Sequence, residues 1–335
     1  MTIEAVKKLI PLLQGANRIL LSTHKQCDGD GLGAELAMGF ALKKMGKEVY
    51  IVNVDQTPRK YRFLQPEKHI QIYLNDPHIP EDIDLALIFD TNDRRIVEPL
   101  FSAVEKNTKN IAFVDHHPVL SSGPQPSRLS WIETNAASTG EMAYDLIHGL
   151  GIAIDAKIAE ALYTSVTFDT QLYRYIRNSP KSHLIAAELL SHGVDVPKVH
   201  RHLFAHQTPN KIAFLASALA RIEYSFNLRV AFVRVLSQDL VQFKLDPDDV
   251  RDIIDMLMNI ENLEAAVIVR EDGPGTFKLS LRSKGKIPVL PVAEALGGGG
   301  HLYSSGAYVK MDVDPLKEHL MNHFSRALKL LDEKN

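Results

Sequence analysis

Three apolar runs in the first 120 residues each end in side chains that can bind a metal ion. The runs at 19–23, 84–89 and 111–114 continue into His24-Lys25-Gln26-Cys27-Asp28-Gly29-Asp30, Asp90-Thr91-Asn92-Asp93 and Asp115-His116-His117. Apolar runs of this length, separated by helix-like segments, predict buried parallel strands. Because the carboxyl ends of parallel strands meet at one edge of a sheet, the sequence predicts that these Asp and His side chains gather there.

Strand-like and helix-like segments alternate through the first half of the chain, which predicts an α/β fold with a doubly wound, mainly parallel sheet. The expected strands here are 19–22, 49–54, 85–89 and 111–114, and the expected helices are 6–13, 31–45, 57–64 and 95–104. From residue 138 to residue 220 the pattern is almost wholly helical, with helices at 182–192, 196–204 and 210–219.

A second, smaller α/β domain is expected after these helices. Its predicted strands are 228–235, 265–270 and 276–281, and its predicted helices are 247–259 and 291–296. We therefore divide the chain into a first domain at 1–190, a helical connector at 191–221 and a second domain at 222–330.

The composition is that of a globular protein, and it limits the classes of partner. The formal net charge of −3 provides no general attraction for long nucleic acid, so nucleotide binding should be local and directed at a small ligand. The single cysteine, Cys27, excludes an internal disulfide. The amino-terminal residues lack the apolar core of a signal peptide, and no apolar run approaches the ~20 residues of a membrane helix. We therefore expect a cytoplasmic protein with no membrane partner.

A fourth acidic residue, Asp169, lies in an otherwise apolar, helix-like run, where a buried carboxylate is costly unless it is paired or bound to a metal. If Asp28, Asp30, Asp90 and Asp169 converge, their charges repel one another strongly, and two divalent cations would neutralise them. Mixed imidazole and carboxylate ligands suit manganese. Two ions roughly 3.5–4 Å apart can activate water and hold the oxygens of an in-line displacement at phosphorus. The residues therefore predict hydrolysis of a phosphoester.

Each of these residues also has a simpler interpretation when it is taken alone. An aspartate at the end of a strand is more often a helix cap or a turn residue than a ligand. His24 alone could be a packed or an exposed histidine, and Asp93 with Arg94 could begin a solvated helix. Cys27 could be a small packing residue. The coincidence of four acidic clusters favours the metal site.

These motifs resemble the DHH phosphoesterase superfamily. The resemblance is to the branch of oligoribonucleases and phosphoadenosine-phosphate phosphatases (nanoRNase type), which adds a DHH-associated (DHHA1) carboxyl domain. It covers nearly the whole chain and rests on His24-x-x-x-Asp28-Gly29-Asp30, Asp90 with Asp93 and Arg94, Asp115-His116-His117 and Asp169-Thr170, with Tyr61-Arg62-Phe63-Leu64 and Ser138-Thr139 as further family positions.

The resemblance implies a metal site with two manganese ions, for which Mg²⁺ or Co²⁺ are candidate substitutes. His24, Asp28 and Asp90 would hold one ion, and Asp30, Asp90, His116 and Asp169 would hold the other, with Asp90 bridging. It also implies that Asp115 orients His116 and that His117 faces the scissile phosphate as a polarising group or a proton donor. Arg94 would be a substrate contact.

The second half of the resemblance lies in the carboxyl domain. The segments 279–285 and 297–301 resemble the substrate signature of the DHHA1 domain, which implies substrate contacts from Arg282, Ser283, Lys284, Gly298, Gly299, Gly300 and His301. Arg282 offers a planar fork for a phosphate and Lys284 a point charge. Glycines let backbone amides approach an anion closely. The alternative is a flexible loop beside a basic strand.

The chain departs from the family pattern at a few positions. The family usually has a proline where Cys27 stands and a glycine where Gln171 stands, and it has small alanines where Ser304 and Ser305 stand. None of these departures removes a proposed metal ligand, so they bear on substrate preference.

We therefore expect a manganese-dependent exoribonuclease that hydrolyses very short oligoribonucleotides, from dinucleotide to about pentanucleotide, to mononucleotides. 3′-Phosphoadenosine 5′-phosphate, which would yield AMP, is a second candidate substrate. The alternatives are a phosphodiesterase of linear or cyclic dinucleotides, a non-catalytic nucleotide sensor and a structural assembly module. The family resemblance also implies a homodimer.

Overall fold

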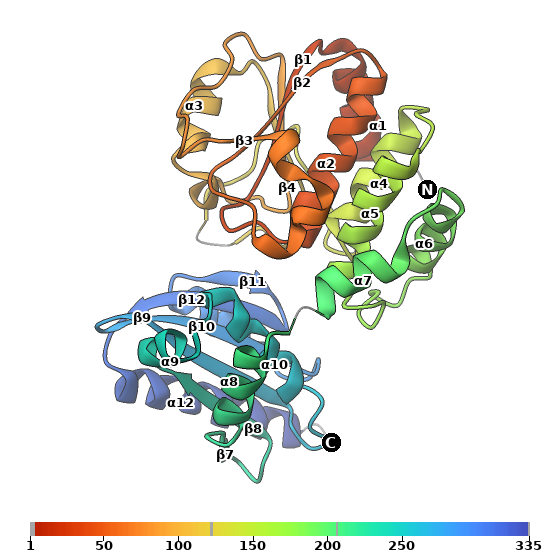
Figure 1. The fold of residues 1–335 in the computed structure, drawn as a ribbon. Coiled ribbons are helices and arrows are strands. Elements are labelled where there is room, and N and C mark those ends of the chain that lie inside the picture. The colour runs from red at the N-terminus through yellow and green to blue at the C-terminus, as the bar shows by residue number, and fades with distance from the viewer. Residues whose placement is uncertain (1–3, 121–122, 206, 334–335) are drawn as a thin grey trace. The chain divides into compact units, whose positions relative to one another are not determined.

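The computed structural model describes residues 4–120, 123–205 and 207–333. The chain divides into two compact units, Met1–His206 (unit 1) and Gln207–Asn335 (unit 2), which are described separately below (Figure 1). Among the described residues, no helix combines the length and the apolar character needed to cross a bilayer.

Unit 1 is built around a parallel sheet. Its elements are α1 (Glu4–Gly15), β1 (Arg18–Thr23), α2 (Gly29–Lys44), β2 (Glu48–Asn53), the 3-10 helices η1 (Arg59–Leu64) and η2 (Pro66–Lys68), β3 (Ile70–Ile72), β4 (Leu85–Phe89), the 3-10 helix η3 (Arg94–Val97), α3 (Leu100–Asn107), β5 (Ile111–Asp115), β6 (Trp131–Ile132), α4 (Thr139–Gly149), α5 (Ala156–Asp169), α6 (Lys181–Ser191) and α7 (Val196–Phe204). The strand order is β3-β2-β1-β4-β5-β6, and every neighbouring pair is parallel. This confirms the predicted doubly wound parallel sheet.

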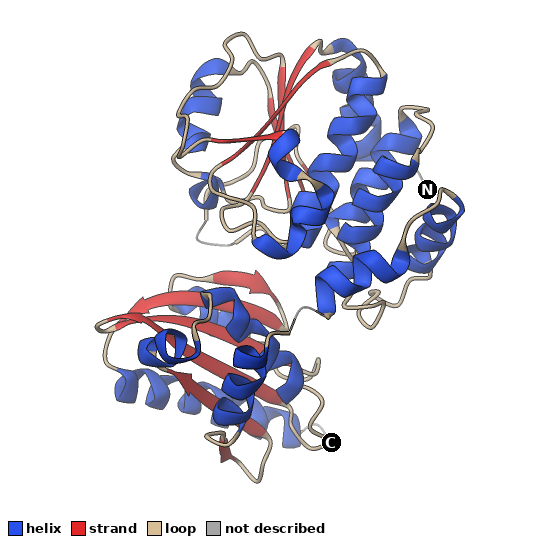
Figure 2. Ribbon diagram, viewed as in Figure 1, coloured by secondary structure: helices blue, strands red, loops and turns tan. Residues whose placement is uncertain are grey.

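Alternate residues of the central strands enter cores on opposite faces of this sheet. Leu21 and Leu87 belong to the core formed with α1, α2, α4 and α5, whereas Leu20 and Ile88 belong to the core formed with η3 and α3. Figures 1 and 2 show these helices on the two sides of the sheet. The strand order reverses between β1 and β4, and in folds of this kind the crevice at that point is where ligands bind.

Two glycines allow α2 to pack closely against α5. A Cβ atom on Gly33 would lie 2.5 Å from the carbonyl oxygen of Ala161, and a Cβ atom on Gly29 would lie 2.7 Å from Cγ of Phe168. A larger residue at either position would push the two helices apart. The close packing matters for the site because α5 ends at Asp169, beside the loop that precedes α2.

Unit 2 is a smaller α/β unit around a mixed sheet. Its elements are α8 (Pro209–Leu219), β7 (Glu223–Ser225), β8 (Val230–Val235), α9 (Ser237–Phe243), the 3-10 helix η4 (Pro247–Val250), α10 (Arg251–Leu257), β9 (Ala265–Gly273), β10 (Thr276–Ser283), α11 (Leu290–Ala295), β11 (Gly299–His301), β12 (Ser304–Lys310) and α12 (Val313–Asp332). The strand order is β11-β12-β10-β9-β8-β7, in which β8 and β9 are parallel and the other pairs are antiparallel. Helices α11 and α12 cover one face, and α8 and α10 cover the other.

The structure differs from the expected elements at several places. Pro99 breaks the helix expected at 95–104 into η3 and α3, because proline lacks the N–H that a helix interior needs. The expected connector at 191–221 spans the boundary between the units, with α7 in unit 1 and α8 in unit 2. Strands β3, β6, β7, β11 and β12 and helices α9 and α12 were not expected.

Candidate metal centre

The loop between β1 and α2 brings a histidine and two aspartates to the switch point of the sheet. The Nδ1–H of His24 donates to the carbonyl of the next residue at 2.8 Å, which leaves its Nε2 facing Asp90 Oδ2 at 3.6 Å. Asp28 caps α2, and its carboxylate accepts from the backbone N–H of Asp30 at 3.0 Å. A Cβ atom on Gly31 would lie 2.1 Å from Thr23 Oγ1, so only glycine permits the first turn of α2 to lie so close to β1.

Asp90 occupies the middle of the site. It follows β4 directly with φ of 62°, a left-handed conformation that aspartate tolerates better than most residues. Its Oδ1 accepts from the hydroxyl of Thr139 at 2.9 Å and lies 3.6 Å from His116 Nε2, while its Oδ2 faces His24. The two oxygens of this carboxylate therefore face two different histidines.

The ligand atoms form two groups around Asp90. His24, Asp28 and Asp90 bring one ligand atom each to within 4.8 Å of one another, and Asp30, His116 and Asp169 do the same. His116 Nε2 lies 3.5 Å from both Asp30 Oδ2 and Asp169 Oδ2. All six residues that were expected to bind metal thus come together, from the β1–α2 loop, α2, the ends of β4 and β5, and the end of α5.

Asp30 is held by the amino terminus of α4. Its carboxylate accepts from the backbone N–H groups of Thr139 at 2.7 Å and Gly140 at 3.0 Å, and from the hydroxyl of Ser165. The partial positive charge at a helix amino terminus stabilises a carboxylate placed there. Ser138 and Thr139 were noticed in the sequence, but the contribution of Ser165 was not, because it comes from the middle of α5.

Asp115 orients His117 rather than His116, which corrects the expectation. Its Oδ1 accepts from the Nδ1–H of His117 at 2.8 Å, and its Oδ2 accepts from the side-chain amide of Asn92 at 2.6 Å. The Nδ1–H of His116 points instead to the carbonyl of Ala136 at 3.2 Å. The reason is geometric, because β5 ends at Asp115 and the following turn brings the backbone N–H of His117 to within 3.1 Å of Asp115 Oδ1. Asn92 was not identified from the sequence, although its place directly after β4 is a usable signal.

Neighbouring charges give the two adjacent histidines opposite properties. Burial, together with the positive charge of His117, lowers the pKa of His116 to about 4, so its Nε2 keeps a lone pair at neutral pH. Burial alone would also lower the pKa of His117, but the carboxylates of Asp115, Asp90 and Asp169 raise it to about 10. A neutral imidazole whose other nitrogen donates to a carbonyl is the form that binds metal ions.

The carboxylates are crowded enough to disfavour their ionised forms. Burial and the charges of Asp90 and Asp169 raise the pKa of Asp30 well above its usual range. Burial also raises the pKa of Asp90, in spite of its contact with His24. Divalent cations would reverse this effect, because an adjacent positive charge favours ionised carboxylates. The donor set of carboxylates and neutral imidazole therefore fits two such cations.

Arg94, the first residue of η3, contacts two side chains of α3. Its guanidinium is 3.6 Å from the carboxylate of Glu105 and lies over the ring of Phe101. Asp93 caps η3 and pairs with Arg95. The structure thus places Arg94 with α3 and not with the two metal-binding groups.

In unit 2, strand register aligns Arg282 and His301 on either side of one serine. Arg282 on β10 pairs with Ser304 on β12, and Ser304 pairs with His301 on β11. Directly paired residues of antiparallel strands share a face of the sheet. Lys284 is placed differently, because its Nζ contacts the backbone carbonyls of Ile260 and Glu261. Ser283 accepts from the backbone N–H of Gly285 at 3.3 Å.

The glycines before His301 are required by the packing of β11 on β12. A Cβ atom on Gly298 would lie 2.0 Å from the carbonyl oxygen of Gly306, and one on Gly300 would lie 2.6 Å from that of Ser304. Gly300 also has φ of 132°. The backbone of β12 therefore occupies the space beside these two glycines.

Family models match both units. The model of the DHH family, N-terminal domain, matches residues 18–166, and the model of the DHHA1 domain matches residues 227–333. The chain belongs to the DHH family, in the branch that carries a DHHA1 domain.

Individual proteins resemble most of this DHH–DHHA1 chain. The bifunctional oligoribonuclease and PAP phosphatase NrnA of Thermus thermophilus is 29% identical over 306 residues, which are 90% of this chain and 88% of the relative. The cyclic-di-AMP phosphodiesterase GdpP of Geobacillus thermodenitrificans is 24% identical over 324 residues, 88% of this chain and 45% of the relative. The crystal structure of an exopolyphosphatase-related protein from Bacteroides fragilis has the same fold, with a TM-score of 0.88, 22% identity and 98% of each chain covered.

A buried glutamate supports the loop that carries His24 in the DHH unit. Glu35 on α2 is fully buried, and its Oε1 accepts from the side-chain amide of Asn53 at 2.6 Å. The Oδ1 of Asn53 in turn accepts from the backbone N–H of Thr23 at 3.3 Å. Glu35 Oε2 has no hydrogen-bond partner among the described residues. Burial raises the pKa of Glu35 to about 8, even though the bond from Asn53 and the charge of His24 favour ionisation.

We expect Glu35→Gln to stabilise the protein at neutral and alkaline pH. The pKa of Glu35 rises from 4.5 to about 8 on folding, so ionisation disfavours the folded state and stability falls as pH increases between those values. Thermal unfolding of the metal-free protein should show a Tm advantage of Glu35→Gln that is absent near pH 4.5 and largest at and above pH 8. Glu67→Gln, on the exposed surface of η2, controls for the removal of one negative charge. Parallel pH profiles for the wild type and Glu35→Gln would contradict this prediction.

Proposed function

We propose that this protein is a di-metal phosphoesterase that uses manganese to hydrolyse very short oligoribonucleotides to mononucleotides. The observation that carries the proposal is the pair of ligand groups that adjoin through Asp90, one with His24 and Asp28, the other with Asp30, His116 and Asp169. An arrangement in which one carboxylate serves two neighbouring groups of ligands is what a two-metal site requires. Mixed imidazole and carboxylate donors favour manganese over metals that prefer thiolate ligands.

When bound, two divalent cations supply positive charge to the phosphoryl oxygens and lower the pKa of water. The residues of this chain supply the placement. Asp90 faces both groups, and Thr139 together with the amino terminus of α4 fixes Asp90 and Asp30. Groups that hold ligands in place typically contribute roughly 10- to 100-fold to metal affinity or activity.

His117 is the proton donor in this proposal. Asp115 holds its Nδ1–H, and Asn92 holds Asp115, so the second ring nitrogen, Nε2, points away from this pair of residues. The charge of Asp115, which is not one of the proposed metal ligands, favours the protonated imidazole. The Nε2–H of His117 would then donate to an oxygen of the scissile phosphate, which stabilises the charge that develops there.

The substrate class rests on unit 2 and on the relatives. Arg282 offers a bidentate fork for a phosphate, and His301 lies in the same row of side chains. The name of the Thermus relative supports short RNA and PAP (3′-phosphoadenosine 5′-phosphate) as substrates. The similarity to GdpP favours a dinucleotide phosphodiesterase as the second candidate. A non-catalytic sensor is disfavoured, because all six proposed ligands are present.

The test is a time course of hydrolysis with manganese on end-labelled RNAs from dinucleotide to decanucleotide. 3′-Phosphoadenosine 5′-phosphate and a linear dinucleotide of adenosine are assayed in parallel. We expect rapid conversion of the shortest RNAs to mononucleotides, with no turnover in chelator. Asp90→Ala should lower activity by more than the roughly 100-fold that follows removal of a supporting group, since it removes a ligand itself. Circular dichroism checks that the variant is folded. Failure to hydrolyse any of these substrates while metal still binds would refute the proposal.

A second prediction concerns Ser304, which stands between Arg282 and His301 where the family usually has alanine. If this row contacts the substrate, Ser304→Ala should raise KM for a short RNA about 2- to 10-fold, which corresponds to the net free energy of one hydrogen bond. Ser305→Ala is the matched control, because Ser305 is buried beside Leu281 and its hydroxyl has no partner among the described residues. We expect Ser305→Ala to leave KM unchanged and to keep or raise Tm. Equal changes of KM in the two variants would contradict the assignment.

A further inference from the structure

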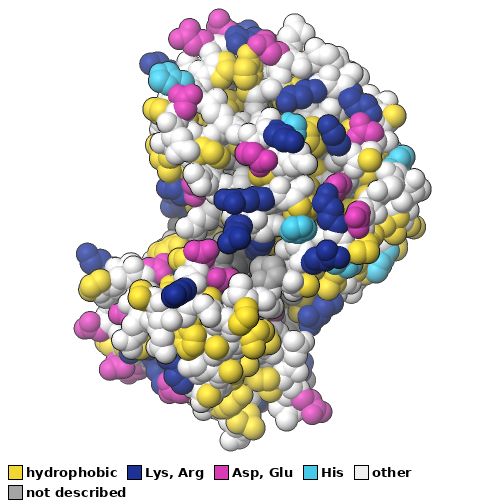
Figure 3. Space-filling view, in the orientation of Figure 1, with side chains coloured by type: hydrophobic (Ala, Val, Ile, Leu, Met, Phe, Trp, Pro, Cys, Tyr) yellow, Lys and Arg dark blue, Asp and Glu magenta, His cyan; other side chains and the backbone are white. Residues whose placement is uncertain are grey.

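A basic surface on unit 1 is not used by the metal centre. It is formed by η1 and α7, which contact each other, and we call it the η1–α7 strip. Its cations are Arg59, Lys60, Arg62, Lys198 and Arg201. Neither η1 nor α7 contains an acidic residue. Figure 3 shows Lys and Arg side chains, with a histidine among them, gathered over this part of unit 1.

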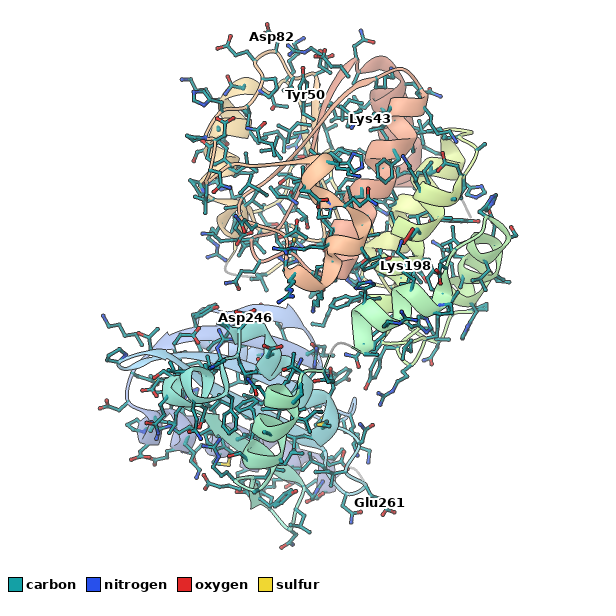
Figure 4. The ribbon with its side chains drawn as sticks, in the orientation of Figure 1. Lys43, Tyr50, Asp82, Lys198, Asp246 and Glu261 are labelled. Carbon is teal, nitrogen blue, oxygen red and sulfur yellow. The ribbon has the colours of Figure 1, made fainter. Side chains whose placement is uncertain are left out.

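Aromatic rings lie between the cations of the strip. The ring of Phe63 stacks on the ring of His202, with centroids 4.8 Å apart and planes inclined by 16°. The Nζ of Lys198, which Figure 4 shows on α7, lies 5.6 Å from the centroid of Phe63. His202 is exposed and Phe63 is partly exposed. Stacked rings between cations are the usual platform for the bases of a single strand, whose phosphates contact the cations.

The strip begins beside the metal centre. The Nζ of Lys60 lies 4.9 Å from the centroid of Tyr61 and 5.2 Å from that of Phe168. Phe168 directly precedes Asp169, and it fills the space where Gly29 lacks a side chain. Lys60 therefore joins the loop of the first ligand group to the rest of the strip within a single unit.

Folding does not account for these charges. Helix α7 is anchored by the buried residues Val199 and Leu203, and η1 is anchored by the buried Tyr61. The side chains of Arg59, Arg62 and Arg201 are exposed or partly exposed. Lys198 pairs with Glu160 of the neighbouring α5, which leaves an excess of positive charge on the strip. This local excess contrasts with the net charge of −3 of the whole chain.

We propose that the η1–α7 strip binds the nucleotides of a short single-stranded oligoribonucleotide that extend beyond those held at the metal centre. Arg62 and Arg201 contact the phosphates, and the stacked pair of Phe63 and His202 receives a base. The proposal rests on the proposed function for the identity of the substrate. It accounts for binding of substrates longer than a dinucleotide by a chain whose net charge offers no general attraction for RNA.

The experiment measures binding of a fluorescein-labelled pentaribonucleotide by anisotropy in chelator, so that no hydrolysis occurs. The double variant Arg62→Gln/Arg201→Gln is compared with Lys7→Gln/Lys43→Gln, which removes two exposed cations from α1 and the far end of α2. The strip variant should bind the pentanucleotide at least about fivefold more weakly at low salt. The slope of log affinity against log salt should fall by about 1.4, that is about 0.7 for each phosphate that the variant no longer neutralises. The control should match the wild type.

A second measurement compares KM for a pentanucleotide with KM for a dinucleotide in the presence of manganese. The ratio of the two KM values should rise in Arg62→Gln/Arg201→Gln and stay constant in Lys7→Gln/Lys43→Gln. Identical affinity, salt slope and KM ratio in both variants would overturn the proposal. Binding to vesicles of anionic phospholipid is measured for the same variants. Loss of vesicle binding in the strip variant, with RNA binding equal to that of the wild type, would also overturn the proposal. If no RNA is hydrolysed and the strip variant still binds the pentanucleotide more weakly, the proposed function fails and the strip assignment stands.

Discussion

Repulsion among closely packed carboxylates is the constraint that the contacts of unit 1 must overcome. Asp28 and Asp30 lie at the start of α2, Asp90 follows β4, and Asp169 ends α5. Burial with mutual repulsion raises the pKa of Asp30 well above its usual range. The fold holds these groups together by directed contacts, from the amino terminus of α4 to Asp30 and from Thr139 to Asp90. Two divalent cations would offset the remaining charge, so the same crowding that costs stability in the free protein would create affinity for metal.

The two adjacent histidines illustrate how backbone geometry divides roles. His116 and His117 are neighbours in sequence and both approach Oδ1 of Asp90, but the Nδ1 of each ring meets a different hydrogen-bond partner. The carbonyl of Ala136 leaves the Nε2 of His116 facing Asp30, Asp90 and Asp169, whereas Asp115 keeps His117 protonated. One imidazole is thereby suited to bind a cation and the other to donate a proton. Burial and local charge achieve this difference without any change of residue type.

The sequence predicted the parallel sheet and the convergence of Asp28, Asp90 and His116, because apolar runs followed by Asp and His residues report directly on strand ends. It could not predict Ser165 or the Asp115–His117 pair, which depend on helix packing and on side-chain direction at the end of a strand. The short strands β3, β6 and β11 have two or three residues each, too few for a periodic signal. The 20-residue helix α12 was missed although Leu316, Leu320, Phe324 and Leu328 repeat every four residues.

The most direct test of the central claim is a count of manganese ions per chain with their magnetic interaction, by titration followed by electron paramagnetic resonance. If Asp90 serves both groups of ligands, the protein binds two ions per chain. Their spins should be coupled, because a shared carboxylate holds such ions roughly 3.5–4 Å apart. Binding of a single ion per chain, or of two ions without coupling, would contradict the account.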